Sequence, residues 1–479
     1  MSGSGREALR RGWRAFAACV FILAAWPVAA QQSPPQPAAP EAQKPATTEP
    51  PQQPGAGAQV HTGIVNTLDA DQRIQNLLAD HQFSQVESAL DQLPPQQAQL
   101  YRGILANRNN NPQASVQLLE PLVEAVAASG DPAHEKLLRK ALAEDYLRLG
   151  DWAKAAKAYA ALEARMKDTL SKDEQDEIEM PLKMLPLAQA DPPMTVEPCD
   201  PFSVQVSKDP LGLTDIPVFV DARPHSWMLD PTAPFNLIAR SLAKEAGLRV
   251  SDETATIHTL TGKPMQVRVT VIPRFTIAGQ LTLRNMTAFV FEDADYYFAQ
   301  SKYQVQGVLG YPALAALGSI TITADATAEV RPERQILPAA KDDRLTNGAR
   351  FFLDGDQVIV ALGKAGDERM FVVDAGGQQT YLTSRYFDEH TPDFAGKRME
   401  LFTLPGSSLR PPAPAYIAET IPLTAGSSAF SVHYIQVLTQ PLGSAALDDV
   451  YGVLGVDALD QLRAYTFDYR TMRFGVKPE

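Results

Sequence analysis

The stretch Trp227–Leu248, which reads WMLDPTAPFNLIARSLAKEAGL, decides the fold of this chain. An apolar run ends in the carboxylate of Asp230, a tight turn follows, and a helix-like segment begins. A carboxylate placed against buried apolar strands is costly unless it has a partner or a function. Met370–His390, which reads MFVVDAGGQQTYLTSRYFDEH, repeats this order around Asp374. The recurrence indicates that the two stretches are related.

The repetition extends well beyond the two aspartates. The sequence Gly-Val-Leu-Gly occurs twice, and it ends at Gly310 and at Gly455. Gly310 follows Asp230 by 80 positions, and Gly455 follows Asp374 by 81. A hairpin of apolar and β-branched residues precedes each aspartate, and a helix-like piece and a closing strand follow each glycine motif, at 319–323 and at 464–476. These offsets predict that residues 195–479 are two copies of one β-rich fold, each with an aspartate on a tight turn.

This doubled pattern resembles the retropepsin-like aspartic peptidases, with two lobes fused in one chain. The family pattern is two apolar residues and Asp-Thr-Gly-Ala, followed some eighty residues later by two apolar residues and a glycine before a short helix. The matching positions are Leu229-Asp230 and Val373-Asp374 for the first part, and Val308-Leu309-Gly310 and Val453-Leu454-Gly455 for the second. The resemblance covers about 60% of the chain. It implies that Asp230 and Asp374 are catalytic: they share a proton, so that one activates a water and the other protonates the scissile carbonyl.

The turns after the two aspartates depart from the family pattern. Asp230 is followed by Pro231, Thr232 and Ala233, and Asp374 is followed by Ala375, Gly376 and Gly377. In the family, the threonine hydroxyls hydrogen-bond across the interface, whereas Pro231 and Ala375 have no hydroxyl. Gly376 keeps the family's glycine, but Thr232 places a branched side chain at that position. The positions expected to support the site are Thr232, Ala375, Gly376, Gly310 and Gly455.

Two functional interpretations therefore stay open. In the first, the chain is an atypical but working aspartic endopeptidase, which the retention of both carboxylates favours. In the second, it is a pseudo-peptidase that binds or scaffolds peptides and proteins without cutting, which the loss of the hydroxyls favours. Either version takes an extended polypeptide as an added strand in a cleft between the lobes. A third interpretation makes the aspartates solvated turn residues of unrelated domains, and the matching offsets argue against it.

A hairpin tip is the candidate cover of the first lobe. Thr261, Gly262 and Lys263 lie between two strand-like runs and are expected to form a flap. The corresponding place in the second lobe is 402–414, which is longer and rich in proline. An ordinary surface hairpin is the alternative for each.

The first thirty residues are typical of a secretory signal. Four arginines precede a short apolar run, and small residues follow at a cleavage-like position. A membrane anchor is the alternative, but Pro27 interrupts the run and a polar segment follows at once. Residues 31–65, rich in Gln, Pro and Ala, are expected to form a disordered linker. The sequence therefore predicts an exported protein, periplasmic or secreted, without a membrane span after cleavage.

Residues 66–190 have a helical pattern. Three similar units begin with turn-prone polar residues, at 80–93, 109–123 and 150–164. The third unit resembles a tetratricopeptide (TPR) repeat, because Trp152, Ala155 and Tyr159 fall on one stripe. A plain helical bundle is the alternative. In both cases we expect a packing layer or a surface for a protein partner.

Composition and motifs exclude several other classes. The formal net charge is −13 and no basic run occurs in the mature chain, which argues against a nucleic-acid partner. Of two cysteines, only Cys199 remains after signal cleavage, so no intrachain disulfide can form. No His-Glu-x-x-His, Gly-x-Ser-x-Gly or phosphate-binding glycine loop occurs, so no metal or cofactor is expected. The predicted architecture is multidomain: signal 1–30, linker 31–65, TPR-like helices 66–190, and a mainly-β, bilobal acid-protease-like part with lobes 191–340 and 341–479.

Overall fold

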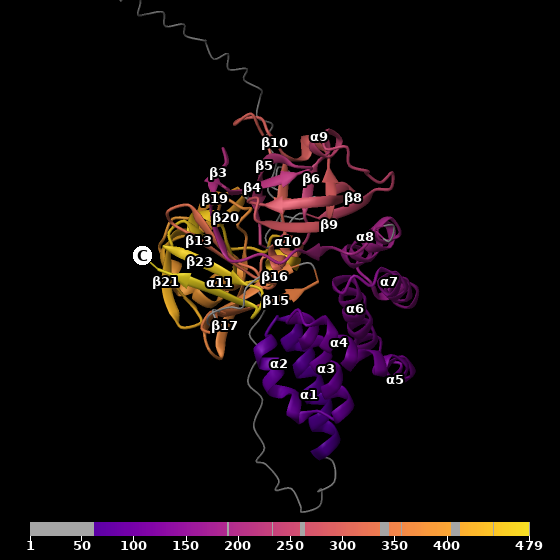
Figure 1. Cartoon of the computed structure of the whole chain (residues 1–479). Coiled ribbons are helices and arrows are strands. Elements are labelled where there is room, and N and C mark those ends of the chain that lie inside the picture. The colour runs from indigo at the N-terminus through magenta and orange to yellow at the C-terminus, as the bar shows by residue number, and fades with distance from the viewer. Residues whose placement is uncertain are drawn as a thin grey trace, which may run out of the picture. The chain divides into compact units, whose positions relative to one another are not determined.

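The computed structural model describes residues 62–188, 191–231, 233–258, 264–335, 344–355, 357–403, 412–443 and 445–478 (Figure 1). The predicted signal segment and nearly all of the predicted linker lie outside these ranges. So do Thr232 and the predicted flap tip Thr261–Lys263. Within the described ranges, no helix is both long and apolar enough to cross a membrane.

The N-terminal part of the described chain is helical, and the rest is mainly β. The α-helices of the first part are α1 (Thr62–Ala79), α2 (Phe83–Ala89), α3 (Pro95–Arg108), α4 (Pro112–Leu119), α5 (Val123–Ser129), α6 (Pro132–Arg148), α7 (Trp152–Met166) and α8 (Lys172–Ala188). Short 3-10 turns lie between some of them, at Leu90–Gln92, Glu120–Leu122 and Lys167–Thr169.

Polar caps explain where several of these helices begin. The side chains of Asn111, Asp131 and Asp151 accept hydrogen bonds from the first free N–H groups of α4, α6 and α7. Such caps contribute about 0.5–2 kcal/mol each. Gly130 and Gly150 follow α5 and α6 with φ values of 72° and 71°, the left-handed backbone that glycine adopts without strain. The polar residues that open the units at 109–123 and 150–164 are therefore helix boundaries.

The β part forms two large sheets and one small hairpin. One sheet holds β1 (Thr195–Val196), β3 (Ser207–Lys208), β4 (Thr214–Val220), β5 (Arg223–Leu229), β6 (Leu237–Ala239), β7 (Ala255–His258), β8 (Pro264–Ile277), β9 (Leu281–Phe291) and β12 (Gly307–Leu309). The hairpin pairs β10 (Tyr297–Phe298) with β11 (Tyr303–Gln304).

Most strands of the larger sheet come later in the chain than those of the first sheet. It holds β15 (Ala349–Asp354), β16 (Gln357–Lys364), β17 (Asp367–Val373), β18 (Tyr381–Leu382), β19 (Glu400–Phe402), β20 (Ala413–Ala425), β21 (Ser428–Leu438), β22 (Gly452–Leu454), β23 (Ala464–Asp468) and β24 (Arg473–Lys477). It also includes β2 (Phe202–Gln205), β13 (Ser319–Thr323) and β14 (Thr327–Arg331). Small helices lie between the strands: α9 (Arg240–Glu245), α10 (Tyr311–Ala316), α11 (Ser384–His390), α12 (Ala445–Asp448) and α13 (Val456–Leu459).

The strands around the two aspartates pair in the same way. We call β1–β14 the first half and β15–β24 the second half. In the first half, β12 runs parallel to β5 and antiparallel to β6. In the second half, β22 runs parallel to β17 and antiparallel to β18. A long hairpin, β8–β9 or β20–β21, then adds a parallel neighbour to β6 or to β18.

One set of strands joins the two halves. β13 of the first half pairs antiparallel with β23 of the second, from Ser319 opposite Asp468 to Thr323 opposite Ala464. The stretch 464–476, expected from the sequence to be one closing strand, is a hairpin of β23 and β24. The turn between these two strands begins at Tyr469. The apolar alternation of Tyr465, Phe467 and Tyr469 shifts its phase before Met472, Phe474 and Val476, and this shift marks the turn.

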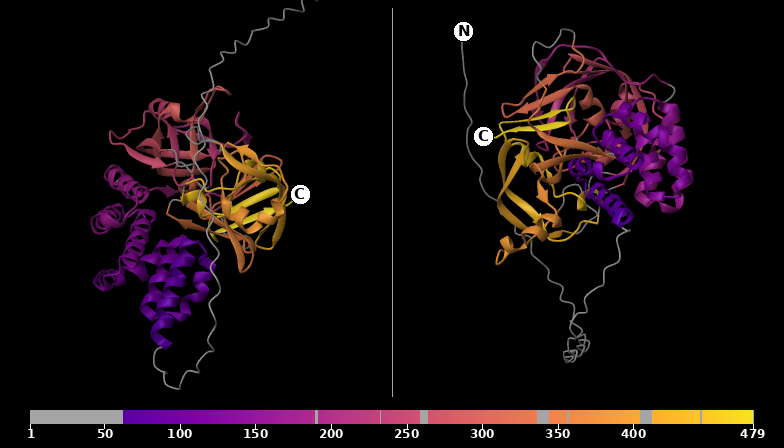
Figure 2. Two further views of the ribbon diagram at one scale, coloured as in Figure 1. Left: turned by 180° about the vertical axis from the view of Figure 1, so that it is seen from behind. Right: turned by 90° about the horizontal axis from the view of Figure 1, so that it is seen from below.

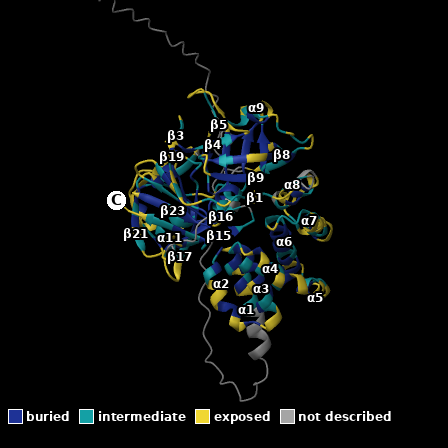
Figure 3. Ribbon diagram, viewed as in Figure 1, coloured by how far each residue is buried: buried dark blue, intermediate teal, exposed yellow. Residues whose placement is uncertain are grey.

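The helices share their hydrophobic core with the second half. Phe83 of α2 packs on Phe352 of β15 with ring centroids 4.8 Å apart. Ile359 and Met370 belong to the same buried cluster as the helices, whereas Met184 of α8 belongs to the cluster that fills the β part. Figure 3 shows the buried interiors of the sheets and the exposed outer turns of the helices, and Figure 2 shows the same chain from two other sides.

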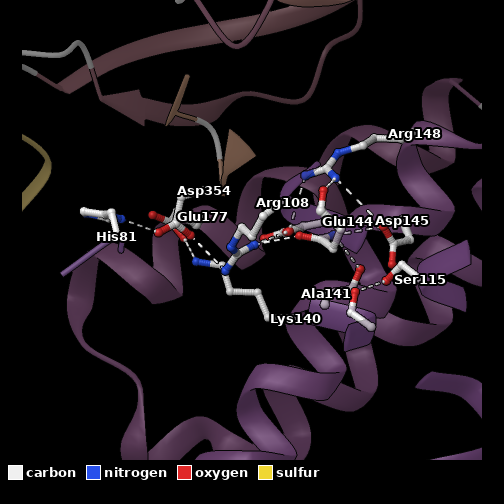
Figure 4. Close-up of polar contacts among 12 residues, drawn as sticks. His81, Arg108, Ser115, Lys140, Ala141, Glu144, Asp145, Arg148, Glu177 and Asp354 are labelled. Carbon is white, nitrogen blue, oxygen red and sulfur yellow. Dashed lines mark hydrogen bonds and ion pairs between the residues drawn. The ribbon is translucent and has the colours of Figure 1, made fainter. Parts of the chain in front are cut away.

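A buried ionic network reinforces this contact (Figure 4). Asp354, at the end of β15, pairs with Arg108 of α3 at 2.8 Å and with His81 at 2.8 Å. Arg108 also pairs with Glu144 of α6 at 3.3 Å. Burial alone would raise the pKa of Asp354, but the charges of Arg108, His81 and Lys140 lower it well below its usual range. The helices and the second half are therefore one packed body.

Candidate functional site

Asp230 occupies the end of β5, where the chain turns away from the sheet. Its backbone N–H donates to the carbonyl of Leu309 in β12 at 3.0 Å, so the neighbouring strand fixes its position. The N–H of Ala233 donates to the Asp230 carboxylate Oδ1 at 3.2 Å. Gly310 follows β12, and a Cβ there would lie 2.1 Å from the carbonyl oxygen of Phe235. Only glycine allows this loop to pass so close to the strand.

Asp374 occupies the equivalent place at the end of β17. Its N–H donates to the carbonyl of Leu454 in β22 at 2.9 Å, and the N–H of Gly377 donates to the Asp374 carbonyl at 3.1 Å. A Cβ at Gly455 would lie 2.6 Å from the backbone of Gln379. The two Gly-Val-Leu-Gly motifs thus perform the same task, which is to hold the loop that follows an aspartate.

Two polar side chains that the sequence analysis missed hold these glycines. Asn236 Oδ1 accepts the N–H of Gly310 at 3.2 Å, and Thr380 Oγ1 accepts the N–H of Gly455 at 2.8 Å. Both glycines and both side chains are deeply buried. Asn236 lies six positions after the first aspartate and Thr380 six positions after the second. Their common offset was a usable signal, but different residue types concealed it.

The structure brings the two aspartates together. An added Cβ at Gly376, two residues after Asp374, would lie 2.5 Å from Oδ2 of Asp230. An added Cβ at Gly377 would lie 2.3 Å from Oδ2 of Asp374. Residues 230 and 374, which are 144 positions apart in the chain, therefore have their carboxylates around the same glycine pair.

Proximity and burial change the acidity of the pair. Burial first, and then the charge of Asp230, raise the pKa of Asp374 to about 8, while the N–H groups of Gly376 and Gly377 oppose the shift by hydrogen bonding. Two close carboxylates cannot both ionise at low cost, so they titrate as a pair that shares one proton. This is the electrostatic requirement for one acid and one base at the same site.

The other predicted site residues are Ala375, Thr232 and the three residues of the predicted flap. Ala375 is buried, with 2% of its surface exposed, and it packs in the core of the β part. Thr232 lies outside the described residues, as do Thr261, Gly262 and Lys263. The strands that flank this predicted flap do pair, from Ala255 opposite Val267 to His258 opposite Pro264.

One contact across the two halves was not foreseen. The Nε2 of Gln378 donates to the backbone carbonyl of Leu211, so the loop after Asp374 is bound to a segment just before β4. No sequence pattern identifies this bond, because its acceptor is a main-chain oxygen 167 positions away.

The charges of the pair also affect the pKa of two tyrosines. Burial first, then the charges of Asp230 and Asp374, raise the pKa of Tyr296, which follows β9. Burial raises the pKa of Tyr469 most. The neighbouring Tyr311 hydroxyl and the Asp230 charge raise it further. These tyrosines were missed because neither is near Asp230 or Asp374 in the sequence.

In the part of the chain that the structure describes, no group of three or more His, Cys, Asp or Glu side chains could hold a metal ion. Two surface hollows of about 270 Å³ each lie elsewhere, one lined by Ser319, Thr321 and Asp468 and the other by Arg73, Gln85 and Glu368.

Comparison with known protein families supports the resemblance to aspartic peptidases. A family model described as aspartyl protease matches residues 216–313, which run from β4 into α10 and include Asp230 and Gly310. The first half therefore contains an aspartyl-protease-like domain. No curated protein matches the chain.

Two solved structures resemble the chain over most of their own length. Conglutin gamma, a basic 7S globulin from lupine seeds, is 12% identical with a TM-score of 0.36, and the match covers 59% of this chain and 96% of that one. Basic 7S globulin from soybean is 10% identical with a TM-score of 0.36, covering 58% and 95%. Similarity at this level says nothing about the activity of this chain.

Proposed function

We propose that this chain is an exported aspartic-peptidase-like protein whose two β halves are the lobes of one site, and that it hydrolyses extended polypeptide with Asp230 and Asp374. The observation that carries the proposal is the meeting of two aspartates that reach the same place through the same strand pairings. The family match over the first half supports it. The substrate would lie as an added strand between the lobes.

The proposed mechanism uses only these carboxyl groups and one water. In this proposal Asp374, whose pKa burial and the Asp230 charge raise, holds the shared proton, and Asp230 acts as the ionised base. Asp230 takes a proton from the water as the water oxygen bonds to the peptide carbon, and Asp374 gives its proton to the carbonyl oxygen. Collapse of the resulting diol breaks the C–N bond, with a proton delivered to the leaving nitrogen. No covalent intermediate is formed.

The packing around the pair suits this task. Gly310 and Gly455 allow close approach of each loop, and Asn236 and Thr380 hold those glycines from within. A displacement of about 1 Å in a catalytic pair costs on the order of a hundredfold in rate, so such support matters.

One observation favours a second function. Neither Pro231 nor Ala375 offers the hydroxyl that links the two loops in the peptidases that this chain resembles. In this alternative the chain is a pseudo-peptidase that binds extended peptide without cutting it. Under both the peptidase and the pseudo-peptidase proposals, the helices would be a docking surface for a protein partner.

The test is cleavage of an unfolded protein mixture by the purified chain without residues 1–30, from pH 3 to 8. Asp230→Asn and Asp374→Asn should each abolish cleavage, whereas the exposed Asp393→Asn should not change it. Peptide binding by a folded sample that cuts nothing at any pH would favour the alternative. Equal cleavage by the wild-type chain and both site variants would contradict the assignment of the two aspartates.

A further inference from the structure

A second pair of aspartates lies in the hairpin formed by β3 and β4. Asp215, in β4, is only 4% exposed, and its Oδ1 is buried without a hydrogen-bond partner among the described residues. Oδ2 of Asp209, in the turn between the two strands, is buried without such a partner as well. An ionised carboxylate oxygen is costly in this situation, because burial removes its water and nothing replaces it. A proton held between the two carboxyl groups would remove this cost.

The backbone brings these two aspartates together. Ser207 lies opposite Asp215 in the strand pairing. The N–H of Asp209 donates to the carbonyl of Leu213 at 2.9 Å, so the pairing continues as far as the turn. Side chains two positions apart in a strand point to the same face, and diagonal neighbours across a hairpin are within reach of one another. Asp209 and Asp215 are such diagonal neighbours.

The turn between these aspartates is attached to the second half. Oδ1 of Asp209 accepts the N–H groups of Leu211 and Leu213 at 2.8 Å each, so this carboxyl group holds the turn closed. The carbonyl of Leu211 then accepts a hydrogen bond from Nε2 of Gln378, which lies four positions after Asp374. The position of the loop after Asp374 therefore depends on the shape of this turn.

Among the described residues, no cation pairs with Asp215. Its partner in β5 is the apolar Met228, and β8 pairs only with the far end of β4. Tyr303 of β11 donates its hydroxyl to Oδ2 of Asp215 at 3.4 Å, which is a long contact. The only cation in the sequence of the hairpin, Lys208, is paired instead with Asp460 of the second half at 2.8 Å.

These surroundings change the acidity of Asp215. Burial first, and then the charge of Asp209, raise its pKa from 3.8 to about 6, while the hydrogen bond from Tyr303 opposes the shift. Because the folded value lies above the unfolded one, the stabilising contribution of the protonated group is full below about pH 4 and is lost as the pH rises through 6. Asp374, with a pKa of about 8, keeps its proton in this range.

We propose that Asp209 and Asp215 are positioning residues that share one proton, and that the β3–β4 turn holds the loop after Asp374 in place only while this proton is bound. The positioning role rests on the proposed function. When the proton passes to solvent, two ionised carboxylates repel each other across the turn, which opens and withdraws the Leu211 carbonyl from Gln378. The site would then lose this support before its own carboxyl pair loses the shared proton.

Hydrogen exchange of the Leu211 and Leu213 amides measures the opening without any cleavage. The pKa change from 3.8 to about 6 predicts that their protection, corrected for the intrinsic effect of pH, falls about twentyfold between pH 4.5 and 7.5 in the wild-type chain. Asp215→Asn has the shape of the neutral acid and carries an N–H donor, so its protection should change less than about twofold. Asp252→Asn, at an exposed position of the same half, is the control and should reproduce the wild-type fall.

The pH profile of cleavage gives a second measurement. The kcat of the wild-type chain should fall above about pH 6, whereas Asp215→Asn should keep its kcat to about pH 8 with little change in KM. At pH 7 the variant should therefore be faster than the wild-type chain by about three- to tenfold. A merely structural role of Asp215 would instead lower the activity of the variant at every pH.

Each outcome decides a separate point. Protection that does not depend on pH, or that falls equally in the wild-type chain and in Asp215→Asn, would overturn the inference. If Asp215→Asn does not fold, Asp209→Asn answers the same question, because it keeps the Oδ1 acceptor and removes the charge. The same kcat profile in the variant and the wild-type chain would overturn the positioning role. The expected exchange pattern in a chain that cuts nothing would support the proton-dependent turn while refuting the peptidase.

Discussion

Replacement of Asp374 by asparagine is expected to stabilise the folded chain at neutral pH while removing half of the proposed site. Asparagine mimics the neutral carboxyl in shape but has no charge to place beside Asp230. In the folded chain the pKa of Asp374 is raised from 3.8 to about 8. The unfolded chain therefore releases this proton near pH 4, and the folded chain retains it until about pH 8. The stabilising contribution of the Asp374 carboxyl group is therefore full below pH 4. It falls as the pH rises from 4 and is lost as the pH passes through 8.

The expected size follows from the gap between the two values. At pH 7 the gap spans about three pKa units, and each unit is worth about 1.36 kcal/mol, which sets a ceiling of about 4 kcal/mol. Asp374 is partly exposed, so solvent screening reduces this figure. We expect Asp374→Asn to raise the free energy of unfolding by about 2–4 kcal/mol at pH 7 and by less than about 0.5 kcal/mol at pH 3.5.

Urea unfolding at the two pH values measures this difference. The midpoint should rise at pH 7 with an unchanged m-value, which shows that the same surface is exposed on unfolding. Asp393→Asn, at an exposed position, is the control and should change neither midpoint. A variant that is equally or less stable than the wild-type chain at pH 7 would refute the reasoning, because it would show that burial and the Asp230 charge do not disfavour the ionised form of Asp374.

Two further predictions concern the support around the site. Asp354→Ala leaves Arg108 without its 2.8 Å partner and should destabilise the chain by about 3–5 kcal/mol at pH 7, whereas the exposed Asp367→Ala should cost little. Because the pKa of Asp354 is lowered, its contribution is present above its unfolded value and is lost in acid, so the two curves of stability against pH should converge below pH 4. Thr380→Val removes the acceptor of the Gly455 N–H and should cost about 1–3 kcal/mol together with most of the proposed activity, and Thr380→Ser, which keeps the hydroxyl, should retain both. Thermal and urea unfolding measure these effects, and a Val variant as stable as the Ser variant would contradict the role of Thr380.

The aspartyl-protease-like character of the first half could be predicted from the sequence because local chemistry encodes it. An apolar strand that ends in Asp230 and a Gly-Val-Leu-Gly motif ending at Gly310 are each readable in a few residues, and the family match over 216–313 agrees with them. The start of each capped helix was readable for the same reason, since Asn111, Asp131 and Asp151 act within their own turn.

The contacts that define the environment of the pair were not readable in this way. Tyr469, whose pKa the Asp230 charge helps to raise, lies 239 positions after Asp230 in the turn between β23 and β24. The bond from Gln378 to Leu211 uses a main-chain acceptor, which carries no residue-type signal. Such contacts are set by how the sheets close on one another, and a single sequence records that closure only indirectly.

The helical part bears on the site through its contacts with both halves. Phe352 and Met370 of the second half lie in the helical core, and Asp354 is held by Arg108 of α3. At the other end, Met184 of α8 belongs to the core of the β part, and α8 contacts β7 and β8 of the first half. A site made of one aspartate from each half works only while the halves keep their distance, because a shared proton requires close carboxylates. Contacts from the helices to both halves restrict that distance, and the buried network of Figure 4 is the part of these contacts that holds the second half.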